Sequence, residues 1–266
     1  MKKLFLLAGL AFLPFMASNA AAPLTESTFT EIIREAKVVA AKDKSVATAQ
    51  TNTVFHAPDR VRTGNASRVE MTAPDKTITR IGANTIFSFD AAERTILLEQ
   101  GSLLFHAPKG AGGGTIRYRG TAAAVLGTTM ICAVLPDGSF KVLCLEGEVK
   151  VTLKNLLYVI LKAGEMIIVR PDGETFRALE VFSIEKTISR LVLIVGFSEP
   201  LSSLPLILAA AQLQNAQIAA GTIPFITGFD QVVFGIDIVF KLMNPGLPRP
   251  PETPDRTQVP VSRTHP

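Results

Sequence analysis

Short runs that alternate apolar with polar residues recur through the first two thirds of the chain, and they limit its fold more than any other feature. Arg68–Thr72, Thr77–Ile81 and Ile86–Phe89 show this two-residue period, which is typical of strands with one buried face. Pro74-Asp75-Lys76 supplies turn residues between the first two runs. The pattern predicts an all-β domain over residues 28–170.

The same signal predicts seven further strands in this region. They are Thr95–Leu98, Ser102–His106, Thr115–Tyr118, Thr129–Leu135, Phe140–Leu145, Glu148–Thr152 and Glu165–Val169. Turn residues such as Glu146-Gly147 and Ala163-Gly164 separate the runs at roughly the 8–12-residue spacing of all-β folds. We therefore expect a mainly β fold, either a sandwich or a β-helix-like coil of short strands. Thr28–Val39 fits a helix or a long strand.

The character of the sequence then changes, and residues 171–245 are predicted to form a helical extension with short strands. One helix is expected over Leu179–Val195, although the β-branched residues among 192–195 would also suit a strand. A second helix is expected over Leu206–Ala220, with Ser203 as its N-cap. Both helices are expected to pack against the β domain.

The end of the chain divides into two parts. Phe225–Phe240 returns to short β-like runs, with breaks at Gly228 and Gly235. Residues 246–266 contain six prolines and hardly any large apolar side chains. Such a composition cannot bury enough apolar surface to offset the entropy of ordering, so it predicts a disordered tail.

The first twenty residues have the layout of a secretory signal peptide. Met1-Lys2-Lys3 is basic, the run from Leu4 to Phe15 is apolar, and Ser18 and Ala20 fit a small-x-small cleavage site. The apolar run is shorter than the roughly 20 residues that span a bilayer. We therefore expect cleavage after Ala20, a periplasmic or secreted protein, and no transmembrane segment after cleavage.

The charge balance argues against a nucleic-acid partner. Without Lys2 and Lys3, 25 lysines and arginines stand against 23 acidic residues, and the arginines are scattered. Nucleic-acid binding needs a clustered basic face. The apolar fraction of 47% instead indicates a substantial core.

Cys132 and Cys144 are the only cysteines, and an exported chain could join them in a disulfide. They flank a predicted hairpin turn at Pro136-Asp137-Gly138-Ser139. If Leu135 pairs with Phe140, the two sulfurs point to opposite faces; if Pro136 pairs with Phe140, the cysteines oppose each other. Two buried free thiols are the alternative.

Other residue types that could carry chemistry lack the partners they would need. The glycine-rich stretch Lys109–Gly114 has no following Gly-Lys-Ser/Thr, so we expect a turning connection rather than a phosphate loop. His56 and His106 have no Cys, Asp or Glu at metal-ligand spacing, and no serine lies in a Gly-x-Ser-x-Gly elbow. We therefore expect no catalytic residue, no metal and no cofactor.

Glu146 and Glu148 are the remaining route to enzyme chemistry. They lie two residues apart, across Gly147, and on one strand they would share a face. A glycoside hydrolase could use such a pair. A solvated turn at a strand edge produces the same pattern more often, so a hydrolase is the weaker hypothesis.

Between Val61 and Val169 the chain resembles the FecR domain family, periplasmic β modules first known from transducers of iron-siderophore signals. The matching stretches are Arg62–Gly64, Ser67–Met71, Asp75–Gly82, Asn84–Phe87, Gly101–Phe105, Pro108–Arg117, Gly127–Thr129, Leu145–Val149 and Ala163–Met166. Leu126 stands where the family often has arginine. Gly196–Leu206 also looks like the extension of stand-alone exported FecR-domain proteins.

The resemblance implies a non-catalytic module that binds an envelope protein or glycan, with a place in cell-envelope signalling. The signal transducers of the family also carry a cytoplasmic anti-sigma domain and a membrane span, which we do not find in this sequence. A cleaved chain would not reach a cytoplasmic sigma factor. Self-association into a cell-surface scaffold, through exposed strand edges, is the alternative function.

Overall fold

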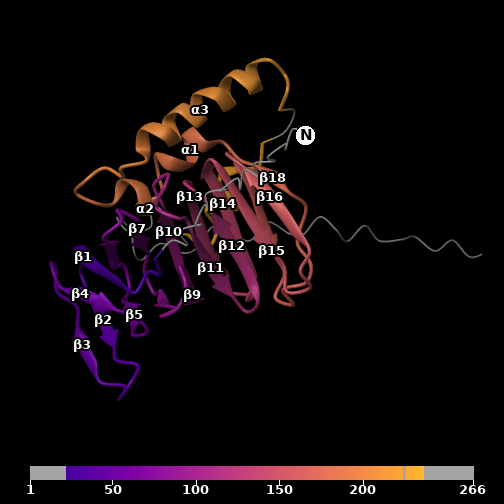
Figure 1. The fold of residues 1–266 in the computed structure, drawn as a ribbon. Coiled ribbons are helices and arrows are strands. Elements are labelled where there is room, and N and C mark those ends of the chain that lie inside the picture. Colours follow the sequence, from indigo (N-terminus) through magenta and orange to yellow (C-terminus); the bar gives the residue numbers. More distant parts are fainter. Residues whose placement is uncertain (1–21, 224–225, 237–266) are drawn as a thin grey trace, which may run out of the picture.

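The computed structural model describes residues 22–223 and 226–236, in which two nine-stranded sheets pack face to face and helices cover the outer face of one (Figure 1). The first sheet, in spatial order, consists of β18 (Glu180–Val181), β17 (Glu165–Val169), β14 (Phe140–Glu146), β13 (Thr129–Val134), β10 (Ser102–His106), β7 (Ile78–Ile81), β6 (Arg68–Thr72), β1 (Glu26–Ile33) and β4 (Val54–His56). The second consists of β16 (Tyr158–Lys162), β15 (Glu148–Thr152), β12 (Thr121–Val125), β11 (Gly114–Tyr118), β9 (Thr95–Gln100), β8 (Ile86–Phe89), β5 (Arg60–Thr63), β2 (Ala36–Val39) and β3 (Val46–Thr48).

The chain moves from one sheet to the other after every one or two strands, and glycines mark several of these crossings. Gly147 joins β14 of the first sheet to β15 of the second with a φ of 73°. A Cβ at this position would lie 2.7 Å from the Thr128 Oγ1, so a side chain is excluded by space as well as by backbone conformation.

Two apolar cores result from this layering. The larger lies between the sheets, where Phe29, Phe55, Phe87 and Phe89 form a cluster with ring centroids 5.3–6.4 Å apart. The smaller lies between the first sheet and the helices. Because β14 is covered on both faces, every one of its residues is buried and its sequence shows no clean alternation.

In the part of the chain that the structure describes, four helices follow the strands. They are α1 (Ile184–Ile188), α2 (Val192–Val195), α3 (Leu204–Ala219) and α4 (Phe229–Val233). Figure 1 shows α3 crossing over the first sheet. The expected mainly β fold with a C-terminal helical part is confirmed, and its two layers make it a sandwich. None of the helices among the described residues is long and apolar enough to cross a bilayer.

Several local expectations are wrong. Thr28–Val39 contains most of β1 and all of β2, separated at Arg34 with a φ of 68°, rather than a helix or one long strand. Leu179–Val195 is divided between β18, α1 and α2, because the Ser183 side chain caps a new helix by accepting a hydrogen bond from the Lys186 N–H at 3.3 Å. The expected β-like run after Gly228 contains the helix α4 instead.

Within residues 28–170, five strands are not found by the period-2 signal: β3, β4, β5, β12 and β16. β12 reads Thr-Ala-Ala-Ala-Val, and alanine favours strands poorly. β16 lies in a continuous apolar run from Leu156 to Leu161, which hides the alternation of its two faces. The expected signal peptide (residues 1–20) and proline-rich tail (246–266) lie outside the described residues.

Candidate functional site

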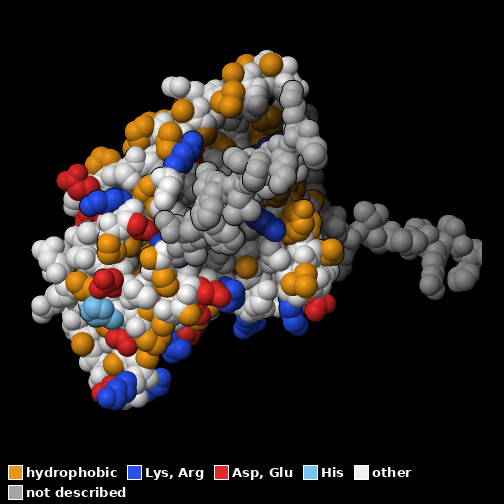
Figure 2. Space-filling view, viewed as in Figure 1, with side chains coloured by type: hydrophobic (Ala, Val, Ile, Leu, Met, Phe, Trp, Pro, Cys, Tyr) orange, Lys and Arg blue, Asp and Glu red, His pale blue; other side chains and the backbone are white. Residues whose placement is uncertain are grey.

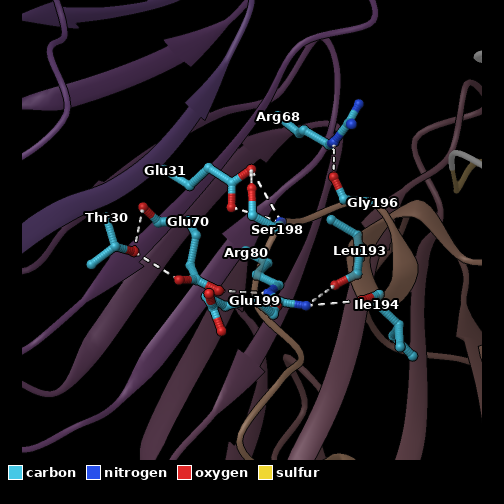
Figure 3. A network of polar contacts seen from close by, with 10 residues as sticks. All are labelled: Thr30, Glu31, Arg68, Glu70, Arg80, Leu193, Ile194, Gly196, Ser198 and Glu199. Carbon is cyan, nitrogen blue, oxygen red and sulfur yellow. Dashed lines mark hydrogen bonds and ion pairs between the residues drawn. The ribbon is translucent and has the colours of Figure 1, made fainter.

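The loop from Gly196 to Pro200, named here the anchor loop, ties the helices to the first sheet (Figure 3). Glu31 on β1 accepts hydrogen bonds from the Ser198 N–H at 3.0 Å and from the Ser198 hydroxyl at 2.9 Å. Arg68 on β6 donates to the Gly196 carbonyl. The loop is thus held at two of its five residues by side chains of two neighbouring strands.

Arg80 on β7 makes the central contact of this anchor and is fully buried. Its Nε donates to Glu70 Oε2 at 2.7 Å, and its two terminal nitrogens donate to the Ile194 carbonyl at 3.0 Å and the Glu199 carbonyl at 2.6 Å. The guanidinium carbon lies 4.4 Å from the centroid of the Phe197 ring. A buried guanidinium is tolerated because its fixed fork of donors is matched by acceptors.

The register of the sheet brings these charges together. Glu70 lies directly opposite Arg80 in the β6–β7 pair, and Glu31 lies opposite Glu70 in the β1–β6 pair. Strand alternation turns these three side chains to the outer face, while neighbours such as Met71 fill the core between the sheets. Taken alone, the sequence offers no sign that this outward row is covered.

A surface cavity of about 410 Å³ opens beside the anchor loop, between α1, α2 and the first half of α3. Its lining is mostly apolar, and Glu185 is the only charged residue among the lining residues. The lining consists of Glu185, Ile188, Ser189, Ile194, Val195, Phe197, Ser198, Pro200, Leu204 and Leu208. The cavity can take an apolar group of a partner and set one carboxylate beside it.

Helix α3 exposes several large apolar side chains. Leu206, Leu208 and Leu213 are 51%, 44% and 63% exposed, and Figure 2 shows apolar side chains along this helix. Only Ile207, Ala211 and Gln214 are buried. Leu208 lines the cavity beside the anchor loop. At 3.6 residues per turn, Leu206 and Leu213 lie on the opposite flank of the helix and do not extend that lining.

Gln214 attaches the far half of α3 to the body of the protein. Its side-chain oxygen accepts from the Ile184 N–H at 3.0 Å, and its side-chain nitrogen donates to the Phe182 carbonyl at 2.7 Å. The buried amide thereby satisfies two backbone groups where β18 gives way to α1.

A second buried polar cluster lies where α3 begins. Thr129 donates to Glu146 Oε1 at 2.8 Å, its Oγ1 lies 2.8 Å from the Ser203 hydroxyl, and His106 Nδ1 lies 3.0 Å from it. Burial raises the pKa of Glu146 and lowers the pKa of His106. Ser203 is the N-cap position of α3, as predicted, but its side chain bonds to the sheet instead of capping the helix.

The expected pairing of Glu146 with Glu148 on one face is wrong. Glu146 ends β14 in the first sheet and is buried, whereas Glu148 begins β15 in the second sheet and is exposed. The positive φ of Gly147 separates them by carrying the chain from sheet to sheet. The two carboxylates therefore do not form the facing pair that a glycoside hydrolase needs.

The two cysteines are free thiols, both buried. Neither hairpin register considered from the sequence is present, because Val134 pairs with Phe140 and Cys132 therefore lies opposite Val142. Cys132 and Cys144 both face the core between the sheets, and burial raises the pKa of each thiol. In this structure the two thiols contribute to packing.

The other residues considered from the sequence as candidate sites lie in a connection between strands or at the surface. Lys109–Gly114 links β10 to β11, and Gly113 has a φ of 70° with Val125 O 1.9 Å from where its Cβ would be. His56 lies at the surface, 3.8 Å from Glu26. Among the described residues no group of three or more His, Cys, Asp or Glu side chains could hold a metal ion.

Comparisons with known proteins support the resemblance over the middle of the chain. Residues 59–150 match a family model described as FecR protein. Two solved structures, each described as a candidate anti-sigma factor from Parabacteroides distasonis ATCC 8503, also match part of the chain. No curated protein matches it.

The two solved structures are distant from this protein. One is 21% identical with a TM-score of 0.40, and the match covers 46% of this chain and 59% of that one. The other is 18% identical with a TM-score of 0.40, and the match covers 61% of this chain and 91% of that one. At these TM-scores neither structure assigns a function.

Proposed function

We propose that this protein is an exported, non-catalytic binding module of the cell envelope that takes an apolar segment of a partner protein into the cavity beside the anchor loop. The apolar lining of that cavity, to which the exposed Leu208 of α3 contributes, is the observation that carries the proposal. Binding sites of this kind are mostly apolar concave surfaces with a few polar groups that fix orientation.

The chemistry of the lining indicates what the partner offers. Leu204, Leu208 and Ile188 would pack against aliphatic or aromatic side chains. Glu185 is the single charge in the lining, so a lysine or arginine next to the apolar residues would complement it. We therefore expect an amphipathic segment with at least one basic residue.

The anchor keeps this surface in place before the partner arrives. Ile194, Phe197 and Ser198 line the cavity. The Ile194 carbonyl accepts a hydrogen bond from Arg80, and the Ser198 N–H donates one to Glu31. A preformed surface loses less conformational entropy on binding than a mobile one does. The β sandwich thus acts as the support for the helical surface.

The place of the protein in the cell is part of the proposal. The signal-peptide layout of residues 1–20 supports export, and the FecR match over residues 59–150 supports a role in envelope signalling. Amino-terminal sequencing of protein recovered from the periplasm is expected to begin at Ala21. Recovery of the intact Met1 end from the cytoplasm alone would contradict export.

Site-specific photocrosslinking tests the binding surface. A photoreactive phenylalanine analogue replaces Leu208, which lines the cavity and is 44% exposed, in cells that export the full chain. The matched control carries the analogue at Val46, which is 60% exposed on β3 in the second sheet.

The proposal expects one dominant protein adduct at position 208 and none of that species at position 46. The adduct is then identified and its crosslinked peptide sequenced, which should reveal an apolar segment with a basic residue. Equal adducts at both positions, or none at position 208, would overturn the proposal.

A further inference from the structure

The two sheets have four outer edges, and three of them are short or covered. β18 has two residues, and its Val181 carbonyl accepts from the Thr227 N–H at 2.7 Å. β3 and β4 have three residues each. Short edges of this kind offer little to a second strand, which is how natural sheets avoid pairing between molecules.

The fourth edge, β16, differs in length and in chemistry. It has five residues, and no described strand pairs with its outer side. Tyr158 and Ile160 are 60% and 47% exposed, and Leu156 and Leu157 just before the strand are 80% and 65% exposed. A long apolar edge without such protection is a template for strand pairing.

The hydrogen bonds of the adjoining hairpin show which backbone groups of β16 are directed outward. The Leu153 N–H donates to the Leu157 carbonyl at 2.8 Å. Because backbone groups alternate along an antiparallel pair, Val159 and Leu161 also turn their groups toward β15. The intervening residues, Tyr158, Ile160 and Lys162, therefore direct theirs to the open side.

We propose that β16 is a dimerisation edge, at which the strand pairs antiparallel with β16 of a second copy and joins two second sheets into one. The outward groups alternate symmetrically about Ile160, so a two-fold axis there places Ile160 opposite its copy and Tyr158 opposite Lys162 of the second copy. A shift in either direction would pair fewer residues, because Leu156 on one side and Gly164 on the other have left-handed φ values of 69° and 83°. The proposal is independent of the cavity beside the anchor loop.

This register pairs the free outward groups other than the Tyr158 carbonyl, and it breaks no bond already made. Each Ile160 exchanges two backbone bonds with its copy, and each Tyr158 N–H donates to the Lys162 carbonyl of the second copy. The Lys162 N–H is already bonded to Glu165 Oε2 at 2.7 Å and can stay so. An isologous contact of this kind closes as a dimer and does not extend into a filament.

The side chains of the edge are also complementary to themselves. Ile160 would meet Ile160 of the second copy, and Lys162 of the second copy would approach the Tyr158 ring. The Lys150 amine of the same chain lies 4.4 Å from the centroid of that ring. At the directly opposed positions an isoleucine meets an isoleucine and each lysine meets a tyrosine, so this edge suits a second copy of itself.

Light scattering during size exclusion tests the dimer in the full mature chain. The wild type is expected at twice the mass of one chain at tens of micromolar. Ile160→Pro removes only an outward N–H, which edge strands tolerate, and should yield half that mass. Circular dichroism and a cooperative unfolding transition establish that this variant is folded.

Val46→Pro is the matched control on the opposite edge of the same sheet. The bonds from Ala40 N to Ser45 O and from Ala49 N to Ala36 O, each 2.9 Å, show that the Val46 N–H also points outward. This variant should keep the mass of a dimer. A monomeric wild type, or a dimer that survives Ile160→Pro, would overturn the proposal. A monomer whose β16 edge pairs with a strand of a different protein would also overturn it.

Disulfide crosslinking tests the register directly and needs no proline. Directly opposed residues of a hydrogen-bonded antiparallel pair have Cα atoms about 5.5 Å apart, a separation that a disulfide spans. Ile160→Cys should therefore form a covalent dimer under mild oxidation. Tyr158→Cys should crosslink several-fold less, since it faces Lys162; the buried Cys132 and Cys144 give little background. Equal crosslinking by both variants would contradict the register.

Discussion

At the scale of single residues, Arg80 and Arg60 pair with a glutamate in different surroundings. The Arg80–Glu70 pair has 0% and 12% side-chain exposure at 2.7 Å, and the Arg60–Glu99 pair has 52% and 42% at 2.8 Å. Removing one partner of a buried pair leaves a charge without water or a counter-ion. Removing one partner of an exposed pair costs little stability, because water and salt already screen both charges.

We expect Arg80→Met to lower the free energy of unfolding by about 3–5 kcal/mol. Arg60→Met, the matched control, should cost about 0–1 kcal/mol. Urea unfolding of the two variants and the wild type measures both values. Equal costs would show that the anchor adds no more than a surface ion pair does.

Glu146 gives a pH-dependent prediction. Because burial holds its pKa above the ordinary value, the folded protein keeps this proton to higher pH than the unfolded chain does. The stability contributed by protonated Glu146 is therefore present at low pH and lost as the pH rises through the folded-state pKa. The direction is opposite to that of a salt-bridged carboxylate.

Glu146→Gln should consequently gain stability relative to the wild type as the pH is raised from about 4 to about 7. The amide oxygen can still accept from Thr129, so the local bond is kept. Urea unfolding at several pH values measures the difference, with exposed Glu148→Gln as the control expected to change little. A difference that shrinks with rising pH would contradict the assignment.

At the scale of elements, residues such as Gly147, where the chain passes from one sheet to the other, determine which strands belong to each sheet. Gly147 and Gly110 have φ values of 73° and 87°, but only at Gly147 would a Cβ meet another group within 4 Å. Comparing the two glycines therefore separates the backbone strain of an added side chain from its steric clash. Backbone strain applies at both positions, and a steric clash applies at one.

Gly147→Ala should destabilise the protein by about 1–3 kcal/mol more than Gly110→Ala, the amount typical of overpacking. Thermal and urea unfolding of the two variants give the comparison. If both substitutions cost the same, the crossing at Gly147 tolerates a side chain and the packing against Thr128 is looser than the structure has it.

Whether an element could be predicted from the sequence depends on which of its faces are buried. β6 and β8 have one face toward the core, and the alternation in Arg68–Thr72 and Ile86–Phe89 is sufficient to find them. β16 is hidden in an apolar run, since its exposed face is itself apolar. The segment Leu179–Val195 has helical composition but is divided, because contacts with the first sheet override local propensity.

The candidate site could be predicted less well than the fold. Glu31, Glu70 and Arg80 occupy positions that a period-2 pattern assigns to solvent. Only the packing of a loop more than a hundred residues later turns them into a buried anchor. The stretch Gly196–Leu206 could be singled out by resemblance, but its contacts with the strands could not.

At the scale of the whole molecule, the sandwich presents two surfaces on different sheets. The first sheet carries the helices and the cavity, and the second sheet ends at β16. A dimer formed through β16 would leave the cavity of each copy on the other layer, so one assembly could hold two partner segments. Partner binding and self-association can therefore be measured separately.

The contacts of Arg80 connect the first sheet with the lining of the cavity. If Arg80 holds the cavity lining in place, Arg80→Met should weaken partner binding even though Arg80 does not line the cavity. The measurement is made on folded variant well below its unfolding transition. Unchanged affinity would indicate that the lining keeps its shape without the anchor.

The dissociation constant of the photocrosslinked partner for the purified chain tests binding through the cavity beside the anchor loop. Calorimetry compares the wild type with Leu208→Asp, in the cavity, and Val46→Asp, on the other sheet. We predict at least a tenfold weakening, about 1.4 kcal/mol, for Leu208→Asp and no change for Val46→Asp. Equal affinity of all three proteins would contradict binding through the cavity.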